Sequence, residues 1–311
     1  MSDSRLKRVF CIGAANIDRK VKLIDPVQFH TSNPAESFYS SGGVARNVAE
    51  NLARLQCPVS LISLFGDDQD RGQICKEMQN LNIDFQHSLT LSEQRTGNYI
   101  CVNAPDGELI LATADMSIYD HFSLNWLEEL WSKIKPAEWI FVDSNLPADS
   151  LQCLIQHAAQ DNLALCVDPV SASKAKKLPN LLEGIEILFP DGSEAEAMTG
   201  ISWQGKPSCR EVWKHLQDRG LKKLIISMGG EGIFAATPGE SEFMPAHPVP
   251  VTDVTGAGDA LAAGVIWGLQ QNLSFLEACE MGIRNASFTV QSKETVCSKL
   301  TPVRLQTYEG N

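Results

Sequence analysis

The string Asp253-Val-Thr-Gly-Ala-Gly-Asp259 combines a turn that can bind an anion with a carboxylate at its end. Gly256 and Gly258 carry no Cβ, so the backbone can turn tightly there and point several N–H groups outward. The small-residue run at 260–269 predicts a buried helix, and the positive end of a helix dipole attracts anions. The string therefore predicts a phosphate-binding turn that opens a helix.

Asp259 has two interpretations on these grounds. In the first, the backbone N–H groups of Gly256, Ala257 and Gly258 stabilise charge on a phosphoryl group in transfer. The Asp259 carboxylate then accepts the proton of the attacking hydroxyl. In the second, Asp259 only complements the helix dipole, which is worth about 0.3–1 kcal/mol. Short glycine motifs recur by chance, so the spacing alone leaves both open.

A second glycine turn precedes another predicted helix. Gly42 and Gly43 break an extended stretch, and apolar residues then recur every three or four positions over residues 44–55. Asn47 falls in the first turn of this helix. Its amide either reaches back over the glycines or only occupies a helix end. The two glycines and this amide form a candidate binding element.

Polar residues also follow the first apolar run, 8–13, which predicts a buried strand. Asn16 and Asp18 come after it, at the sheet edge where open α/β folds bind ligands. Asp18 either caps a turn or binds polar groups of a ligand. The segment Gly13-Ala-Ala-Asn16 does not supply the Gly-x-Gly-x-x-Gly of a dinucleotide-binding dehydrogenase. The acidic cluster at 67–70 lacks the spacing of a calcium loop and predicts a solvated loop.

The elements that position these residues alternate between helix and strand. Such alternation predicts a mostly parallel central sheet with helices on both faces, a three-layer α/β/α fold. Predicted strands are 8–13, 59–65, 139–143, 163–168, 185–190 and two around a glycine turn within 224–234; predicted helices are 44–55, 71–81, 124–135, 148–160, 260–269 and 274–290. Residues 97–113 predict a hairpin, which must pack on other strands because an isolated hairpin is marginal in water. A loop and a tail are expected from residue 292 onward.

Composition bounds the partners and the compartment. The 311 residues carry 26 Lys plus Arg against 38 Asp plus Glu, and a net charge of −12 argues against nucleic-acid or anionic-membrane partners. The nine cysteines form no Cys-x-x-Cys pair, which indicates free thiols of a reducing compartment, not a disulfide framework or a zinc site. Met1 to Arg8 precede no apolar stretch of signal-peptide length, so a cytoplasmic protein without a membrane span is expected.

The two glycine elements together resemble the signatures of the ribokinase, or PfkB-type, family of sugar and nucleoside kinases. The first element matches Gly-Gly-x-x-x-Asn, and the second matches Asp-Thr-x-Gly-Ala-Gly-Asp with Val254 and Thr255 in swapped order. The resemblance implies a single ribokinase-like domain, 1–311, with β-lid segments at about 19–40 and 96–114 over the substrate cleft. It further implies a kinase that uses ATP and Mg²⁺ on a small sugar or nucleoside, and a homodimer formed through the lid.

The resemblance also implies roles for individual positions. For catalysis it implies Asp259 as the base and Gly256, Ala257 and Gly258 as the anion hole. For acceptor binding it implies Asn16, Asp18, Gly42, Gly43, Asn47, Asp115, Met116 and Lys174, although Lys174 also lies in a basic run typical of a solvated face. For the nucleotide it implies Ser227, Gly229, Gly230, Gly232, Thr255 and Asn285, with a plain hairpin turn as the alternative at the glycines. For metal ions it implies Glu194 and Asp191 near Mg²⁺ through water, with Asp191 in place of the family's Asn, and Asp253 and Thr255 beside K⁺.

Four wider strings are most similar to those of pseudouridine kinases within this family. They are Ser32-Asn-Pro34, Ala114-Asp-Met116, Asp168-Pro-Val-Ser171 and Ser227-Met-Gly-Gly230. This resemblance implies the 5′-hydroxyl of free pseudouridine as the phosphate acceptor. The alternative acceptors are ribose, adenosine or a ketose, and the alternative to an enzyme is a catalytically silent ligand-binding protein on the same fold. The presence of Asp259 favours an enzyme.

Overall fold

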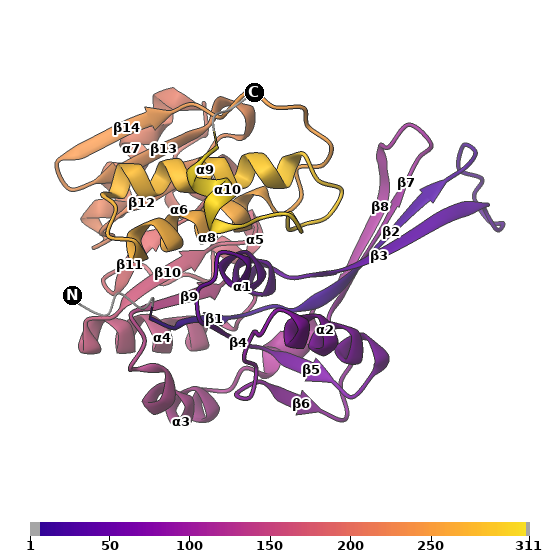
Figure 1. Ribbon diagram of the computed structural model, residues 1–311, viewed down its shortest axis with the longest axis horizontal. Helices are drawn as coiled ribbons and strands as arrows, with labels where there is room; N and C mark the ends of the chain where they lie inside the picture. The colour runs from indigo at the N-terminus through magenta and orange to yellow at the C-terminus, as the bar shows by residue number, and fades with distance from the viewer. Residues whose placement is uncertain (1–6, 309–311) are drawn as a thin grey trace.

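An eight-stranded sheet forms the centre of the computed structural model, which describes residues 7–308 (Figure 1). Its strands, in spatial order, are β14 (Glu240–Met244), β13 (Ile233–Thr237), β12 (Leu224–Ser227), β11 (Ile185–Leu188), β10 (Ala164–Asp168), β9 (Trp139–Asp143), β1 (Val9–Ile12) and β4 (Val59–Ile62). The pairs from β12 to β4 are parallel, and β13 is antiparallel to both of its neighbours. The mostly parallel sheet predicted from the alternation is confirmed.

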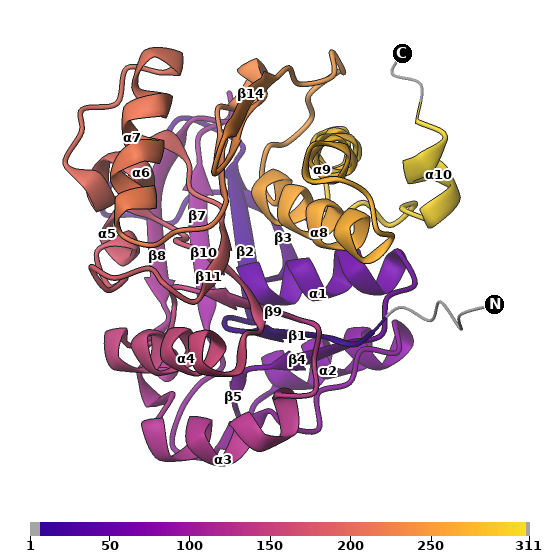
Figure 2. The same cartoon turned by 90° about the vertical axis from the view of Figure 1, so that its left-hand side faces the viewer.

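Helices cover both faces of this sheet (Figure 2). One face packs on α1 (Val44–Arg54), α2 (Gln69–Asn80), α8 (Ala257–Gln270) and α9 (Phe275–Val290), and the other on α3 (Leu124–Ile134), α4 (Ala148–Asp161), α6 (Gly192–Thr199) and α7 (Lys206–Asp218). Each face has its own cluster of buried apolar side chains, because the inner strands are apolar on both sides. The three-layer fold predicted from the sequence is therefore present.

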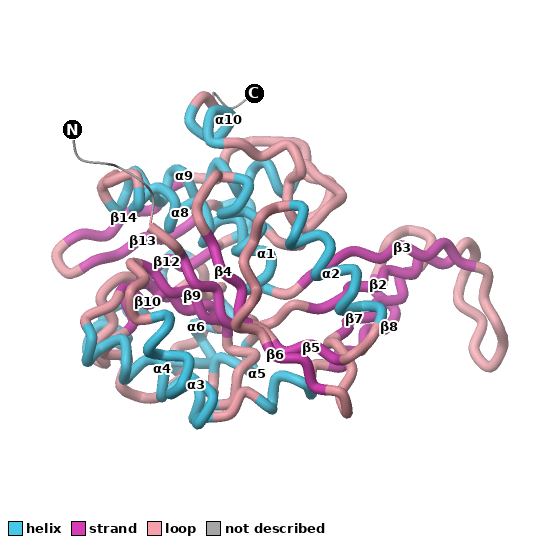
Figure 3. The backbone as a smooth tube through the Cα atoms, turned by 60° about the horizontal axis from the view of Figure 1, so that its bottom comes forward, coloured by secondary structure: helices cyan, strands magenta, loops and turns pink. Residues whose placement is uncertain are grey.

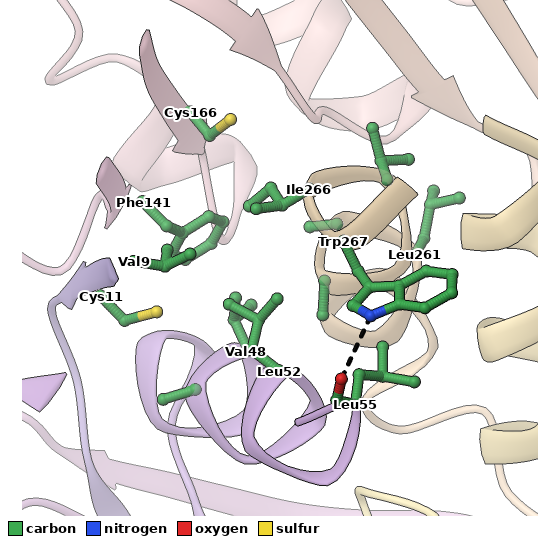
Figure 4. Close-up of a cluster of buried hydrophobic side chains, with 14 of the residues drawn as sticks. Val9, Cys11, Val48, Leu52, Leu55, Phe141, Cys166, Leu261, Ile266 and Trp267 are labelled. Atoms are coloured by element: carbon green, nitrogen blue, oxygen red, sulfur yellow. Dashed lines mark hydrogen bonds between the residues drawn. The ribbon is translucent and has the colours of Figure 1, made fainter. Parts of the chain in front are cut away.

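The helices α1 and α8 pack directly on each other (Figure 4). Val48 and Leu52 of α1 and Leu261 of α8 belong to one buried cluster, and the Trp267 indole donates to the Leu55 carbonyl oxygen at 3.1 Å. Burying an indole without this acceptor would leave its N–H unsatisfied. The contact matters for function because α1 follows one glycine turn and α8 follows the other.

A second, four-stranded sheet projects from the main body (Figures 1 and 3). Its order is β3 (Ala35–Gly42), β2 (Asn16–Leu23), β7 (Asn98–Asn103) and β8 (Leu109–Asp115), and we call it the lid sheet. The strands β7 and β8 form the predicted hairpin, and β2 pairs with β7 in parallel. Arg19 of β2 makes a two-oxygen ion pair with Asp70 of α2 at 2.7 and 2.8 Å, which ties the sheet to the body.

Several details differ from the sequence prediction. The expected strand 59–65 breaks at Ser63, whose hydroxyl donates to the Gly13 carbonyl at 2.6 Å, and β5 (Leu64–Gly66) then pairs with β6 (Leu89–Leu91) in a separate small sheet. The acidic segment is not a solvated loop, because Asp68 caps α2 and accepts from Thr96. The expected tail contains α10 (Pro302–Gln306), whose Leu305 is buried.

The remaining sequence predictions concern membrane spans and the N-terminal residues. Between residues 7 and 308, no helix combines the length and the apolar content that a bilayer crossing requires. The expectation for Met1 to Arg8 lies, except for Lys7 and Arg8, outside the described residues.

Candidate active site

Asp143, at the end of β9, holds together the segments that form the base of the site. Its carboxylate accepts from the backbone N–H of Ala14 at 2.8 Å, after β1, and of Ala45 at 3.0 Å, at the start of α1. A Cβ on Gly13 would lie 2.3 Å from this carboxylate, so only glycine allows the approach. The glycine that ends the first strand is therefore fixed by packing against Asp143.

Asp18 and the glycine pair fit against each other. Asp18 lies beside Gly42 across the β2–β3 pair, and a Cβ on Gly42 would come within 2.3 Å of its carboxylate. Gly43 has φ 97°, a conformation that residues with a side chain rarely adopt, and a Cβ there would lie 2.4 Å from the Ala14 carbonyl oxygen. The Asn16 amide donates to Asp18 at 2.7 Å. Burial raises the pKa of Asp18, although Asn16 and the nearby cations oppose that shift.

The two glycine elements meet at Asn47 and Asp259. The Asn47 amide, in the first turn of α1, donates to the Asp259 carboxylate, in the first turn of α8, at 2.8 Å. Both side chains are buried, and among residues 7–308 no cation pairs with Asp259, since the nearby Arg46 pairs with Glu50 and Glu77. Burial raises the pKa of Asp259 to about 7; Asn47 lowers that pKa, while the charges of Asp143 and Asp18 raise it further. A carboxylate with this acidity can accept a proton near neutral pH.

The turn before Asp259 presents backbone N–H groups. Gly256 has φ 83°, and a Cβ there would lie 2.1 Å from the Thr295 carbonyl oxygen, so glycine is required. Within residues 7–308, the N–H groups of Gly256 and Gly258 donate to no acceptor. The Ala257 N–H instead closes the turn onto the Val254 carbonyl at 3.2 Å. Two of the three expected anion-hole donors are thus free, and Ala257 supplies turn geometry.

A cavity of about 820 Å³ begins at this turn and extends toward β12 and β13. Ala257 and Gly258 line it near α8, and the predicted nucleotide residues Ser227, Gly229, Gly230 and Gly232 line it on the sheet side. Trp203, from the segment between α6 and α7, lines it as well, with its indole against Gly192. Sequence reasoning missed Trp203, because an isolated tryptophan in a loop carries no spacing signal.

The chain matches one known protein family over nearly its whole length. The model of the pfkB family of carbohydrate kinases matches residues 6–301. The chain belongs to the pfkB carbohydrate kinase family. It is 31% identical to a pseudouridine kinase of Escherichia coli over 271 residues, 87% of this chain and 86% of that protein. It is 27% identical to a ribokinase of Haemophilus influenzae, over 97% of this chain and 98% of that one.

Solved structures agree on the fold of this pfkB-family chain. A carbohydrate kinase from Agrobacterium tumefaciens superposes with a TM-score of 0.84 at 28% identity, and each chain is covered to 96%. A ribokinase from Arabidopsis thaliana, solved with ribose and ATP, gives a TM-score of 0.84 at 19% identity, with 98% and 99% covered. The ribokinase fold is therefore shown, and the chain is a phosphotransferase of the pfkB type.

Asn285 does not lie where the resemblance to this family placed it. Its amide is fully buried and donates to Asn51 at 3.0 Å and to the Ala260 carbonyl at 2.8 Å, inside the contact between α9, α1 and α8. The α9 residues that line the cavity are Ile283, Ala286, Ser287 and Val290. They share one helical face, and Asn285 points away from it. The expected nucleotide contact of Asn285 is thus replaced by a structural role.

The predicted acceptor residues Asp115, Met116 and Lys174 differ in exposure and in their contacts. Asp115, the last residue of β8, is exposed and accepts from the Ser117 hydroxyl at 2.9 Å, whereas Met116 is half-buried beside Gly97. Lys174 is half-buried and donates to the Asn145 side chain at 2.5 Å, so it does not belong to a solvated face. Burial lowers the pKa of Lys174. Asn145 in turn donates to Asp143, which links Lys174 to the base of the site.

Carboxylates gather where the family is expected to use Mg²⁺. Burial raises the pKa of Asp168 well above its ordinary value, and the charges of Glu194, Asp259 and Asp143 raise it further. Burial raises the pKa of Glu194 to about 7. Asp191, an exposed residue, caps α6 and forms a capping box with Glu194, each accepting at 2.8 Å. Glu194 and Asp168 lie close enough for their charges to interact, and no cation in the described part of the chain is among the charges that shift either pKa. Carboxylate oxygens are ligands that Mg²⁺ prefers, so these two residues fit the ion.

The expected K⁺ position does not fit a free cation at the Asp253 carboxylate. One oxygen accepts from the Thr255 N–H at 2.9 Å and its hydroxyl at 2.7 Å, and the other pairs with Lys20 of the lid sheet at 2.5 Å. Burial alone would raise the pKa of Asp253, but Lys20 and Thr255 hold that pKa below its ordinary value. The ammonium of Lys20 therefore already supplies the positive charge at this carboxylate.

Two residues near the site, Lys20 and Tyr119, were not predicted from the sequence, because both act through partners distant in sequence. Tyr119 is fully buried, and its hydroxyl donates to the Ala15 carbonyl at 2.7 Å and accepts from the Ala15 N–H at 2.9 Å. It thereby fixes the segment that leads into Asn16. Asp168, in contrast, ends a predicted strand and belongs to the string Asp168-Pro-Val-Ser171 identified in the sequence.

Proposed function

We propose that the protein is an ATP-dependent kinase that transfers phosphate to the 5′-hydroxyl of free pseudouridine. The observation that carries the kinase chemistry is the Asn47–Asp259 hydrogen bond of 2.8 Å, directly after Gly258, which lines the 820 Å³ cavity. It brings a buried carboxylate, with a pKa of about 7, together with a helix N-terminus that has free N–H groups. The acceptor assignment is supported by the 31% identity with the pseudouridine kinase of Escherichia coli.

In this proposal each element has one task. Asp18, Asn16 and Asn47 hold the ribose hydroxyls, and Gly42 leaves room for the Asp18 carboxylate. The 5′-hydroxyl is thereby placed beside Asp259, which converts a bimolecular encounter into a positioned in-line attack. Asp259 accepts the hydroxyl proton as the new oxygen–phosphorus bond forms, while the bond from the γ-phosphorus to the bridging oxygen breaks and ADP leaves.

The donor side completes the proposed mechanism. ATP occupies the cavity between Gly229 and Trp203, with its terminal phosphates toward the start of α8. The N–H groups of Gly256 and Gly258 stabilise the negative charge that develops on the transferred group. Glu194 and Asp168 would hold Mg²⁺, mostly through water, and the bound ion would supply positive charge against the phosphates of ATP. Closure of the lid sheet keeps water from competing as the nucleophile.

The chain is proposed to act as one ribokinase-like domain with the lid sheet over the acceptor. Four apolar side chains of the lid sheet are exposed: Phe38 at 58%, Tyr39 at 67%, Leu109 at 59% and Leu111 at 58%. Because so much apolar area is costly in water, we propose that a second copy of the chain covers it in a homodimer. The nine cysteines are all free, and we propose a reducing, cytoplasmic compartment for that reason.

An acceptor panel tests the function. Release of ADP from ATP with Mg²⁺ is measured with pseudouridine, uridine, adenosine, ribose and fructose at equal concentrations. The proposal expects the highest kcat/KM for pseudouridine. A higher value for ribose or adenosine would replace the acceptor and keep the kinase. If no acceptor supports ADP release while nucleotide still binds, the chain is a silent ligand-binding protein.

A further inference from the structure

A cluster of three different potential metal ligands lies outside the active site, between α3 and α4. Glu128 projects from α3, and Cys153 and His157 come from α4, four residues apart. That spacing puts both side chains on one face of the helix, toward the neighbouring helix. One ligand atom of each residue lies within 4.8 Å of the other two. No step of the proposed phosphate transfer uses these residues.

The geometry points to a binding site for a divalent zinc-like ion held by Glu128, Cys153 and His157. The His157 Nε2 atom lies 3.0 Å from one Glu128 oxygen, and the Cys153 Sγ atom lies 3.7 Å from the other. Ligand atoms around a tetrahedral zinc ion are separated by about 3.3–3.7 Å, given bonds of about 2.0–2.3 Å. The three residues therefore need only small rotamer adjustments to surround one ion.

The chemistry of the donors selects the class of metal. Thiolate, imidazole and carboxylate together are the ligand set of Zn²⁺ and Co²⁺, whereas Mg²⁺ requires oxygen ligands. Three protein ligands leave a fourth tetrahedral position, which water would fill. Although the sequence lacks a zinc-ligand spacing pattern, the site draws on two helices, so no such pattern is expected.

Side chains behind the cluster orient the imidazole. The Trp131 ring stacks on His157 with centroids 4.9 Å apart, and the Trp131 indole is itself held by Asp161 at 2.7 Å. Ligands fixed in this way lose less side-chain entropy on metal binding. Burial, together with the carboxylates of Glu128 and Asp149, raises the pKa of Cys153 to about 11. A bound cation would reverse that electrostatic effect and favour the thiolate.

Cobalt titration of the full chain tests the site. The protein is stripped with a chelator and titrated with Co²⁺ in saturating Mg²⁺ and without nucleotide, and a thiolate-to-cobalt charge-transfer band is monitored. The expected result is one Co²⁺ per chain with this band, displaced by Zn²⁺. Cys153→Ser should abolish the band, and His157→Gln and Glu128→Gln should weaken Zn²⁺ binding in calorimetry by at least about tenfold.

A matched variant and a stability readout keep the result unambiguous. Cys75→Ser removes the other half-buried cysteine, on α2, and should leave the band and the affinity unchanged. Zn²⁺ should raise the Tm of the wild type and not that of Cys153→Ser, because the ion joins two helices only when all ligands are present. Absence of binding by the wild type, or binding that survives all three substitutions, would overturn the site.

Discussion

At the scale of the residue, the acidity of Asp259 links the structure to catalysis. Burial is the largest cause of its raised pKa, and the Asn47 amide partly opposes it. The balance leaves this carboxylate near its titration midpoint at neutral pH. Burial also makes the ionised form of Asp259 unfavourable in the folded protein. Ionisation therefore favours activity, because the carboxylate is the base, and lowers the free energy of unfolding.

Replacing Asp259 by Asn should lower kcat by at least about a hundredfold, because the general base is lost. Binding of ATP should persist, since the cavity is lined by other residues. Turnover by ADP release and nucleotide binding by calorimetry measure the two effects separately. The exposed Asp67→Asn variant is the matched control and should behave as the wild type. Near-normal turnover of Asp259→Asn would refute the assigned role.

The same variant should be more stable than the wild type at alkaline pH. Since burial raises the pKa of Asp259 to about 7, the folded state retains a proton that the unfolded state has lost. The unfolding free energy of the wild type therefore falls between the ordinary carboxyl pKa and about 7, by at most about 4 kcal/mol. Asn cannot titrate, so the Tm difference should grow from pH 5 to pH 8. Thermal unfolding at both values checks this, and a constant difference contradicts it.

Asn47→Ala should move the acidic limb of the activity profile to higher pH. The Asn47 hydrogen bond lowers the pKa of Asp259, so its loss should raise that pKa above about 7. The pH dependence of kcat/KM measures the shift. If Asn47 affects only the affinity for the acceptor, kcat/KM should fall by the same factor at every pH and the acidic limb should not move. That result would contradict an effect of Asn47 on the pKa of Asp259.

At the scale of the element, Lys20 joins the lid sheet to the turn before α8. Its ammonium pairs with Asp253, whose other oxygen binds Thr255, and Gly256 of the anion hole follows directly. Strand β2 carries both Lys20 and Asp18, so one strand contacts the proposed acceptor and the phosphate-binding turn. The ion pair therefore couples the position of the lid to the geometry of the turn.

Lys20→Met should make activity depend on a monovalent cation. The wild type should be equally active in potassium and N-methylglucamine salts, because Lys20 carries the charge. The variant should lose about tenfold in kcat/KM, as for a partly buried hydrogen-bonded charge pair, and regain part of it in K⁺ alone. Lys22→Met, on the same face of β2 but exposed, serves as the control. An identical response of the two variants would contradict the coupling.

Element prediction from sequence succeeded where the signal was local. The apolar runs predicted the inner strands. The string Asp253 to Asp259 predicted where α8 begins and that N–H groups are exposed there. It failed where the orientation of an element decides the outcome. The helix α9 carries apolar residues on most sides, so its sequence could not tell that Asn285 faces α1. The spacing of Asp191 and Glu194 also fits a capping box, which the assignment of both residues to Mg²⁺ overlooked and which the structure shows.

The candidate site was predictable in outline for a related reason. Each signature contains its own turn residues, so Asn47 and Asp259 were identified before their contact was known. The pairing of Lys20 with Asp253 was not predictable, because the partners are far apart in sequence and neither belongs to a pattern that names the other. Long-range side-chain pairs follow from the packing of whole elements.

At the scale of the whole molecule, the apolar lid surface predicts a concentration-dependent dimer. Tyr39→Glu combined with Leu111→Glu should shift the sedimentation coefficient to that of a monomer, because charges in an apolar interface lose their hydration. Val303→Glu places the same charge on α10, at an equally exposed position, and should leave the assembly intact. A wild type that sediments as a monomer at all concentrations would contradict the interface.

The order of strands in the central sheet also bears on how the chain is made. Val9 of β1 pairs with Val59 on one side and with Trp139 on the other, and Asp143 must be present to hold the segments after β1 and before α1. A ribosome adding about 5–20 residues per second needs on the order of ten seconds to deliver the second neighbour. During that interval the nascent first strand keeps an open, apolar edge. Because this edge stays unpaired during synthesis, we expect a chaperone to bind the nascent chain until β9 has been made.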